Sequence, residues 1–405
     1  MSEPFMSSRM SEANVGKYFP SPMRGSAVRS LSPDSRSLRA RRRDDIRRLL
    51  LGAVAVAFLL APATASAQKL YITNQGSASI TVVDQQTFSV DTVIDLTKLG
   101  YTANAKPHHA IVEPDGSFWY ATLIGDGRVL KFDSANHLVG EVKMETPGLL
   151  AIDPVHDSLY VGRSMTAVNP PRSLGVIKRS SFTMVEEQEI QIPRPHALVT
   201  TRDGKWVHVA SLAENRFASL ETATGRVTLT TLPGNVTRSM VQFAVTPDGS
   251  RLLVGGELSN TVMVFDLTRL PPFTPIAEFV VNGKPWDPVV SADSRHAYFS
   301  LFADSAVADV DLSTGKVVRT FTGGLAQPYD MILRTDGKYL FVVNQNLGAV
   351  KPGASAHDNM PGMANMPAMA PRTGWLSIIN VATGKVEKTL PLGMGPTGMG
   401  APGAR

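Results

Sequence analysis

The chain of 405 residues contains no cysteine. Disulfide bonds, a thiolate metal site, a cysteine nucleophile and covalent attachment of a c-type haem are therefore excluded. Without disulfides, a chain of this size must be held together by strand pairing and core packing. The 43% apolar residues are ample for a large core.

The chain also lacks excess positive charge once its first segment is set aside. Residues 1–67 hold eleven Lys or Arg and five Asp or Glu, a surplus of six positive charges. Because the formal net charge of the whole chain is +5, about −1 remains for everything after Ala67. Nucleic acids and anionic membrane surfaces are therefore not expected as partners.

Residues 1–67 are predicted to be an export leader. Arg41–Arg43 and Arg47–Arg48 precede an apolar run at Leu49–Leu60, and small residues follow up to Ala67. This order is typical of a secretory signal peptide that is cleaved after Ala67. The alternative is a membrane anchor, but about a dozen apolar residues are too few to cross a hydrocarbon core about 30 Å thick. We expect a periplasmic or secreted protein with no stable membrane span after cleavage.

The remainder of the chain shows the pattern of short strands and tight turns. Runs of β-branched residues alternate with Asp-Gly, Thr-Gly and Asn turns, and no amphipathic helix is evident. One unit has turns at Asp203-Gly204 and Thr224-Gly225 between four predicted strands: Pro195–Val199, Trp206–Ala210, Phe217–Leu220 and Val227–Leu229. The unit recurs about every 40 residues, as the blades of β-propellers do.

Six complete units and two fragments make up residues 68–401. The units begin near Pro107, Pro147, Pro195, Ser239, Pro285 and Pro328. Residues 69–96 lack an innermost strand, and Pro396–Ala401 reads as an innermost strand with nothing after it. Joined, the two fragments complete a seventh blade and remove the open sheet edges. The predicted fold is all-β, a seven-bladed β-propeller with one blade closed by both chain ends.

Three predicted second strands carry a related motif. They read Leu-Tyr-Ile-Thr-Asn at Leu70–Asn74, Leu-Tyr-Val-Gly at Leu159–Gly162 and Leu-Phe-Val-Val-Asn at Leu340–Asn344. With a Pro-x-x-Ala/Leu start and an acidic turn before them, these repeats resemble the YVTN-repeat β-propellers over residues 69–401. The resemblance implies a periplasmic seven-bladed propeller. It implies no single activity, because such relatives include binding proteins of unknown role, lactonase-like enzymes and the haem-carrying propellers of nitrite reductases.

The predicted innermost strands begin with unusually polar residues. Because all innermost strands start at the same end of the central channel, we expect these side chains to ring one mouth of it. His and carboxylate groups that converge there can bind a metal ion, another cation or a small polar ligand. The alternative is a polar plug bound to water. The candidate ligand-binding residues are His108, His109, His196, Gln242, Trp286, Asp287, Tyr329 and Asp330.

A hydrolytic site is not indicated by any motif. The sequence has no Gly-x-Ser-x-Gly and no His-Glu-x-x-His. Lactonase-type propellers typically hold a divalent cation with Glu, Asn and Asp near the same mouth. Asn74, Glu257, Asp304 and Asn344 follow second strands and are the candidates for such a site, although none lies in a matching motif.

The segment 351–374 is a Met-rich insertion in the last complete unit, between the predicted strands Leu340–Asn344 and Trp375–Asn380. Its candidate metal ligands are one His and four Met spaced every third residue, in a run broken by Pro and Gly that is neither a helix nor a strand: His357, Met360, Met363, Met366 and Met369. Thioethers are soft ligands that suit Cu(I). The alternative is a low-complexity loop whose Met content is incidental. A smaller insertion, Arg163–Arg172, occupies the equivalent loop of an earlier unit.

The sequence therefore predicts an exported, non-enzymatic β-propeller that binds copper through its Met/His loop near the channel mouth, and a periplasmic protein partner for it. One alternative is a haem- or metal-dependent oxidoreductase or cofactor carrier, with His108, His109 or His196 as the ligand. A lactonase-like hydrolase is another, and an interaction scaffold without any ligand is the last.

Overall fold

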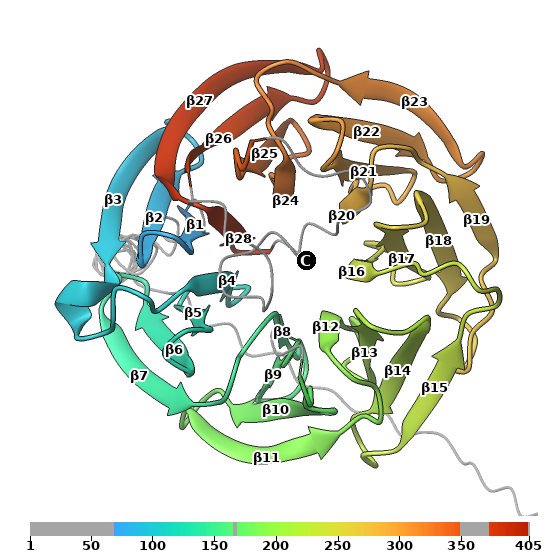
Figure 1. Cartoon of the computed structure of the whole chain (residues 1–405), viewed down its shortest axis with the longest axis horizontal. Coiled ribbons are helices and arrows are strands. Elements are labelled where there is room, and N and C mark those ends of the chain that lie inside the picture. The colour runs from blue at the N-terminus through green and yellow to red at the C-terminus, as the bar shows by residue number, and fades with distance from the viewer. Residues whose placement is uncertain (1–68, 165–167, 349–371, 404–405) are drawn as a thin grey trace, which may run out of the picture. The chain divides into compact units, whose positions relative to one another are not determined.

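The computed structural model describes residues 69–164, 168–348 and 372–403. Their strands form seven antiparallel, four-stranded sheets, the blades, arranged around a common axis (Figure 1). Blade 1 contains β28, β1, β2 and β3, and blades 2 to 7 follow in chain order from β4–β7 to β24–β27. The predicted all-β fold with seven blades is confirmed.

Each blade runs from an innermost strand beside the axis to an outermost strand at the rim (Figure 1). The innermost strands are β28 (Pro396–Gly400), β4 (Pro107–Val112), β8 (Leu150–Ile152), β12 (Pro195–Thr200), β16 (Met240–Val245), β20 (Pro285–Val290) and β24 (Pro328–Leu333). The second strands are β1 (Lys69–Asn74), β5 (Phe118–Leu123), β9 (Ser158–Val161), β13 (Trp206–Ser211), β17 (Arg251–Gly256), β21 (His296–Leu301) and β25 (Tyr339–Asn344).

The third strands are β2 (Ser79–Asp84), β6 (Arg128–Asp133), β10 (Ser173–Lys178), β14 (Arg216–Glu221), β18 (Thr261–Asp266), β22 (Ala306–Asp311) and β26 (Thr373–Asn380). The outermost strands are β3 (Ser89–Asp95), β7 (Leu138–Lys143), β11 (Thr183–Glu189), β15 (Val227–Thr231), β19 (Ala277–Val280), β23 (Lys316–Phe321) and β27 (Lys385–Met394). Strand β26 begins two residues before the predicted Trp375.

The hydrophobic core lies between neighbouring blades. Tyr71 of blade 1 stacks on Trp119 of blade 2 with ring centroids 4.3 Å apart, and Trp119 stacks in turn on Phe132 at 4.1 Å. All three side chains are essentially inaccessible to solvent, whereas most residues of the outermost strands are exposed. Burial of these large rings removes apolar surface from water, and this is the main force that holds blade against blade.

The predicted Asp-Gly turns join the first and second strands of four blades. Gly116, Gly204, Gly249 and Gly337 have φ between 67° and 74°, a region that favours glycine. The preceding Asp accepts a hydrogen bond from the amide two residues later, as in Asp203 to Lys205 N at 3.1 Å. These turns lie at the channel end opposite to the starts of the innermost strands.

Both chain ends form blade 1, as predicted. In the antiparallel pair of β28 and β1, Tyr71 lies opposite Gly400 and Ile72 opposite Met399. The Thr397 hydroxyl donates to the carbonyl oxygen of His108 in blade 2 at 2.9 Å. Strand β28 thus completes a sheet that would otherwise end at an open edge of β1.

One position in the second strands links several blades to the next. The hydroxyls of Thr122 and Ser300 donate to carbonyl oxygens of the next innermost strand, Gly148 O at 2.9 Å and Tyr329 O at 3.0 Å. Where the equivalent residue is Gly255, a Cβ atom would lie 2.5 Å from the neighbouring Pro285 O. At this position a hydroxyl bonds the neighbouring backbone or a glycine makes room for it, whereas β13 and β25 carry the apolar Ala210 and Val343.

Helix is nearly absent from the described residues. They contain one short 3₁₀ helix, η2 (Leu96–Leu99), after β3. Within the ranges that the structure describes, no helix is long and apolar enough to cross a membrane.

Candidate functional site

The starts of the innermost strands meet at one small cavity. All eight candidate residues of the predicted ring line it, together with Leu149, Val241 and Gly398. The alignment of repeats therefore placed these side chains correctly relative to one another. What they can bind depends on the room between them and on the bonds that they already make.

The cavity, which we call the histidine cavity, is small. Its volume is about 20 Å³, enough for one buried water, which needs roughly 10–15 Å³. Pockets for small molecules are typically about 300–1,000 Å³. In the described part of the chain, His108 Nε2 and Gln242 Oε1, which belong to residues lining this cavity, are buried without a hydrogen-bond partner.

Three of the ring residues connect one blade to the next. Each accepts a hydrogen bond from a main-chain amide of the following innermost strand: His109 Nδ1 from Leu150 N at 3.2 Å, Asp287 Oδ2 from Met331 N at 2.7 Å and Asp330 Oδ2 from Met399 N at 2.6 Å. Hydrogen bonds to a carboxylate are strong because the acceptor is charged. These polar residues therefore have a structural role at the strand starts, which the sequence did not reveal.

Two buried histidines of the ring, His108 and His196, are neutral at physiological pH. His196 Nδ1 lies 2.7 Å from Val241 O and so donates to it, and the His108 and His196 ring centroids are 6.3 Å apart. Burial lowers the pKa of His108 to about 4. Burial lowers the pKa of His196 to about 3, and the neighbouring His108 and Arg194 contribute to this decrease. The hydrogen bond to the Val241 carbonyl raises the pKa, but by less.

The aromatic members of the ring belong to an apolar cluster at the same mouth, which we call the mouth cluster. It contains Trp286 and Tyr329, with ring centroids 4.9 Å apart, and the buried side chains Leu212, Val241, Phe302 and Leu347. Burial, followed by the charges of Asp330, Glu257 and Asp287, raises the pKa of Tyr329 well above its usual value. Trp286 and Tyr329 thus have a packing role at this mouth.

Of the four candidates for a lactonase-like cation site, three contact neighbouring side chains and one is exposed. Asn74 Nδ2 donates to Thr81 Oγ1 at 2.9 Å, and Asn344 Nδ2 donates to Ser377 Oγ at 2.9 Å. Glu257 is buried, with its Oε1 3.9 Å from Lys284 Nζ, and Asp304 is exposed. Among the described residues no group of three or more His, Asp or Glu is arranged to hold a metal ion.

The predicted copper ligands His357, Met360, Met363, Met366 and Met369 lie outside the described residues. Asn346 Nδ2 donates to Thr373 O at 3.0 Å, which joins the residues before the insertion to those after it.

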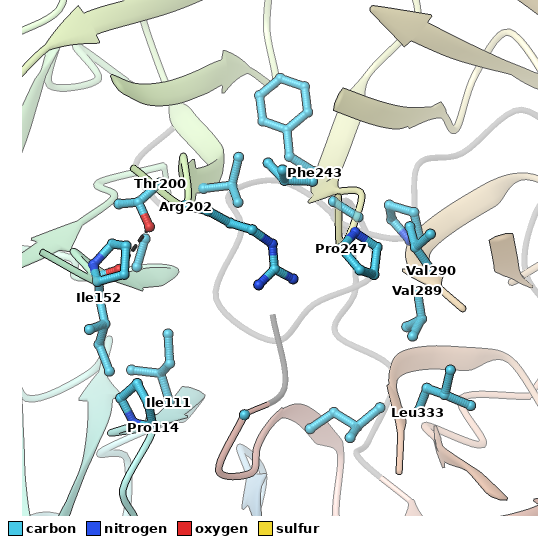
Figure 2. A pocket seen from close by; sticks show the side chains of 18 of the residues that line it. Ile111, Pro114, Ile152, Thr200, Arg202, Phe243, Pro247, Val289, Val290 and Leu333 are labelled. Atoms are coloured by element: carbon cyan, nitrogen blue, oxygen red, sulfur yellow. Dashed lines mark hydrogen bonds between the residues drawn. The ribbon is translucent and has the colours of Figure 1, made fainter. Parts of the chain in front are cut away.

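A second and much larger cavity lies at the opposite end of the innermost strands. Its volume is about 460 Å³, and it is lined by the last residues of six of the seven innermost strands and by the turns that follow them. Figure 2 shows Ile111, Ile152, Phe243, Val290 and Leu333 around this space. We call it the apolar cavity.

A signal for the apolar cavity is present in the sequence, although the repeat pattern alone did not predict the cavity. Several innermost strands end in two consecutive apolar residues: Ile111-Val112, Val289-Val290 and Ile332-Leu333. Successive residues of a strand point to opposite faces. One member of each pair therefore packs against a neighbouring blade while the other faces the axis, where no strand covers it.

Several solved structures share this architecture. A functionally unknown protein from Desulfotomaculum acetoxidans matches with a TM-score of 0.64 and 15% identity, over 82% of this chain and 98% of that one. Dihydro-haem d1 dehydrogenase NirN in complex with DHE matches with a TM-score of 0.55 and 16% identity, over 84% and 76%. A streptogramin B lyase matches with a TM-score of 0.56 and 15% identity, over 68% and 86%. The likeness is one of fold.

No protein-family model matches the chain, and no curated protein sequence matches it. The resemblance to the YVTN-repeat propellers is therefore supported for the seven-bladed fold, and membership of that family is not confirmed.

The structural role of the ring carboxylates predicts a loss of stability from Asp330→Ala. The change leaves the buried Met399 amide without its acceptor, which should lower the free energy of unfolding by about 1–3 kcal/mol. Asp330→Asn keeps an acceptor oxygen and should cost less. Chemical denaturation of both variants checks this, with the exposed Asp304→Ala as a control. A parental stability for Asp330→Ala would show that the hydrogen bond contributes nothing.

The buried histidines also predict acid sensitivity. Burial is the largest cause that lowers the pKa of His208 to about 4, as it does for His108 and, to about 3, for His196. Below pH 6.5 the unfolded chain binds more protons than the folded one, so the free energy of unfolding falls as pH decreases, by up to about 1.4 kcal/mol per pH unit for each histidine. The decline should span pH 6.5 to about 4 for His108 and His208, and to about 3 for His196. Denaturant titrations at pH 7.5, 6 and 5 measure it, and His208→Gln should reduce the slope. A flat profile would contradict the neutral state of these side chains.

Proposed function

We propose that this protein is an exported, non-enzymatic β-propeller that binds Cu(I) through His357, Met360, Met363, Met366 and Met369. Four thioethers and one imidazole within thirteen residues form a soft, uncharged donor set that suits Cu(I). The absence of cysteine leaves Met and His as the soft ligands of the chain.

The observation that supports this proposal most is where the chain enters the Met-rich segment. Leu347 packs with Trp286 and Tyr329 in the mouth cluster, and its amide donates to Gln327 Oε1 at 2.5 Å. The Gln327 Nε2 group donates in turn to the carbonyl oxygen of Gly348. Residues 347 and 348 are therefore fixed at the mouth that also holds the histidine cavity.

The two flanks of the segment are held together at this mouth. Asn346 bonds to Thr373, and a Cβ atom placed on Gly348 would lie 3.2 Å from Arg372 Cζ. The last described residues before the segment and the first described residues after it thus lie side by side. A segment that is tethered at both ends loses less conformational entropy when it closes around an ion than a free terminal tail does. Its binding to the ion is correspondingly tighter.

The histidine cavity is a weaker basis for the alternative functions. A haem, or a hydrolytic cation with its substrate, needs far more room than about 20 Å³. Asp287 and Asp330 already accept main-chain hydrogen bonds, so their use as ligands would cost blade-to-blade contacts. Copper in the Met-rich segment requires none of these bonds to break.

Export of the protein is part of the proposal and has its own test. When the full chain is expressed in a Gram-negative host, the periplasmic fraction should contain a form that begins at Gln68, because the small residues before it form a cleavage site. Intact-mass measurement of that fraction detects the form. Recovery of uncleaved protein in the cytoplasm alone would contradict export.

The metal content of the exported protein tests the binding function. We expect about one copper per chain and no visible absorption after purification under reducing conditions, because Cu(I) has a filled d shell. An intense Soret band would instead indicate a haem protein. Protein that is colourless, contains no copper and takes up no Cu(I) on titration would contradict the copper proposal and favour an interaction scaffold without a ligand.

A further inference from the structure

The apolar cavity has the size of a small-molecule site. Its volume of about 460 Å³ falls within the roughly 300–1,000 Å³ of such sites. It lies at the end of the channel where the Asp-Gly turns are, opposite to the mouth cluster. Nothing in the copper proposal uses it.

The walls of this cavity are apolar and rigid. Ile152, Leu198, Phe243 and Val290 belong to paired innermost strands. Pro114, Pro154 and Pro247 stand in the turns that follow β4, β8 and β16. A proline has a fixed φ and no donor group, so the rim changes little in shape. Such walls favour an apolar ligand without the cost of ordering them first.

One cation among the described lining residues faces this space without a partner. Figure 2 shows the side chain of Arg202, which lies in the turn after β12, directed into the cavity between Ile152 and Phe243. Arg202 is exposed and makes no hydrogen bond or ion pair with another described residue. No Asp or Glu is among the described residues that line the cavity.

The second cation of the lining is already engaged. Arg334 donates to both carboxylate oxygens of Asp336, at 2.9 and 2.7 Å, and to Gln85 O at 3.1 Å. Its guanidinium also lies 4.3 Å above the Tyr339 ring. Of the two arginines that line the cavity in the described part of the chain, Arg202 is thus the one that is available to a ligand.

We propose that the apolar cavity binds a small organic anion, a carboxylate with an apolar body, whose charged end pairs with Arg202. The planar guanidinium matches a carboxylate through two parallel hydrogen bonds. The apolar body then fills the space between the strand ends, where its burial removes it from water. A purely polar anion would gain nothing from the walls, and an uncharged apolar molecule would gain nothing from Arg202.

Calorimetric titration of the full chain with hexanoate, octanoate and decanoate, below their micellar concentrations, tests this proposal. We expect saturable binding at one site. Affinity should rise by up to about fourfold per added methylene group, which is the worth of burying one such group. 1-Octanol, the uncharged counterpart, should bind more weakly than octanoate.

Two variants assign the binding to the cavity. Arg202→Gln should weaken octanoate binding by roughly three- to tenfold. This range lies between the free energy of an exposed ion pair and that of a hydrogen bond to a charged group. The binding of 1-octanol should be unaffected. Arg295→Gln is the matched control, because Arg295 is exposed in the equivalent turn of blade 6 and does not line the cavity. Ala244→Phe places a ring in the cavity from the partly exposed Ala244 and should weaken both ligands at least tenfold.

The possible outcomes distinguish this proposal from the copper proposal. The absence of saturable binding by all three carboxylates would overturn the carboxylate site, and so would equal effects of Arg202→Gln and Arg295→Gln. If Ala244→Phe fails to fold, the Arg202 and Arg295 variants still decide the question. Cu(I) binding should be the same in all these variants, so the two proposals stand or fall independently.

Discussion

Deletion of residues 394–405 is expected to destabilise the protein more strongly than any single substitution would. The deletion removes β28, the strand that closes the ring, and with it the buried side chains Thr397, Met399 and Ala401. Loss of a buried Met side chain alone costs about 2–5 kcal/mol, and the freed edge of β1 is open to pairing with other chains. We expect aggregation, or a melting temperature lower by about 10 °C or more.

Point variants test the same closure without shortening the chain. A Cβ atom on Gly398 would lie 2.5 Å from His108 O, and one on Gly400 would lie 2.8 Å from the carbonyl group of Ala110. Both neighbours are main-chain atoms that cannot rotate away, so Gly398→Ala and Gly400→Ala should each cost about 1–3 kcal/mol, as overpacking does.

Gly140→Ala on β7 is the control for these variants. Its nearest neighbour would be a side-chain atom, Phe182 Cδ1 at 2.8 Å, and not the main chain beside the closing strand. Calorimetric melting of the three variants beside the parent measures the difference. A truncated chain that melts like the parent, or equal melting of Gly140→Ala and Gly398→Ala, would contradict closure by the chain ends.

Replacement of Met360, Met363, Met366 and Met369 by Leu is expected to reduce Cu(I) affinity sharply. Leu keeps the apolar bulk but has no lone pair to donate to the ion. We expect the affinity to fall at least a hundredfold, since all four thioethers are lost. The free energy of unfolding should change by no more than about 0.5 kcal/mol, as for other substitutions outside the core.

Competition for Cu(I) with a chromogenic chelator measures these affinities. Met394→Leu is the control, because Met394 is exposed and lies outside the Met-rich segment. Any Cu(II) or Zn(II) binding should depend on His357 and persist in the quadruple variant. Equal Cu(I) affinities in parent and quadruple variant would mean that the Met content of the segment is incidental.

The repeat pattern was sufficient to predict the fold. Each blade is a local unit whose strand lengths, Asp-Gly turns and Pro starts are written in about 40 consecutive residues. Even the shared blade could be predicted, because residues 69–96 lack the one strand that Pro396–Ala401 provides. Alignment of the repeats then placed the eight ring residues at one cavity.

The roles of those residues could not be predicted in the same way. Asp287 and Asp330 bond amides of the next blade, and Trp286 packs against Leu347, which lies in another repeat. These contacts depend on how adjacent blades are rotated, which no single repeat encodes. The connection that a polar residue at a strand start makes between two blades is therefore not visible in the repeat pattern.

The apolar cavity was missed for a related reason. Paired apolar residues such as Ile332-Leu333 are normal in a strand that is buried on both faces. Only the ring arrangement shows that one face of each innermost strand has no covering sheet. Arg202 can be assigned to the cavity only when that uncovered face is known.

X-ray absorption at the copper edge of the Cu(I)-loaded protein tests the central proposal most directly. Because the chain has no cysteine, every sulfur atom next to the copper must come from methionine. The proposal predicts sulfur neighbours in the parent protein, together with at most one imidazole, and their loss when the four methionines of the segment are replaced by Leu. A spectrum of the parent with nitrogen and oxygen neighbours alone would contradict it.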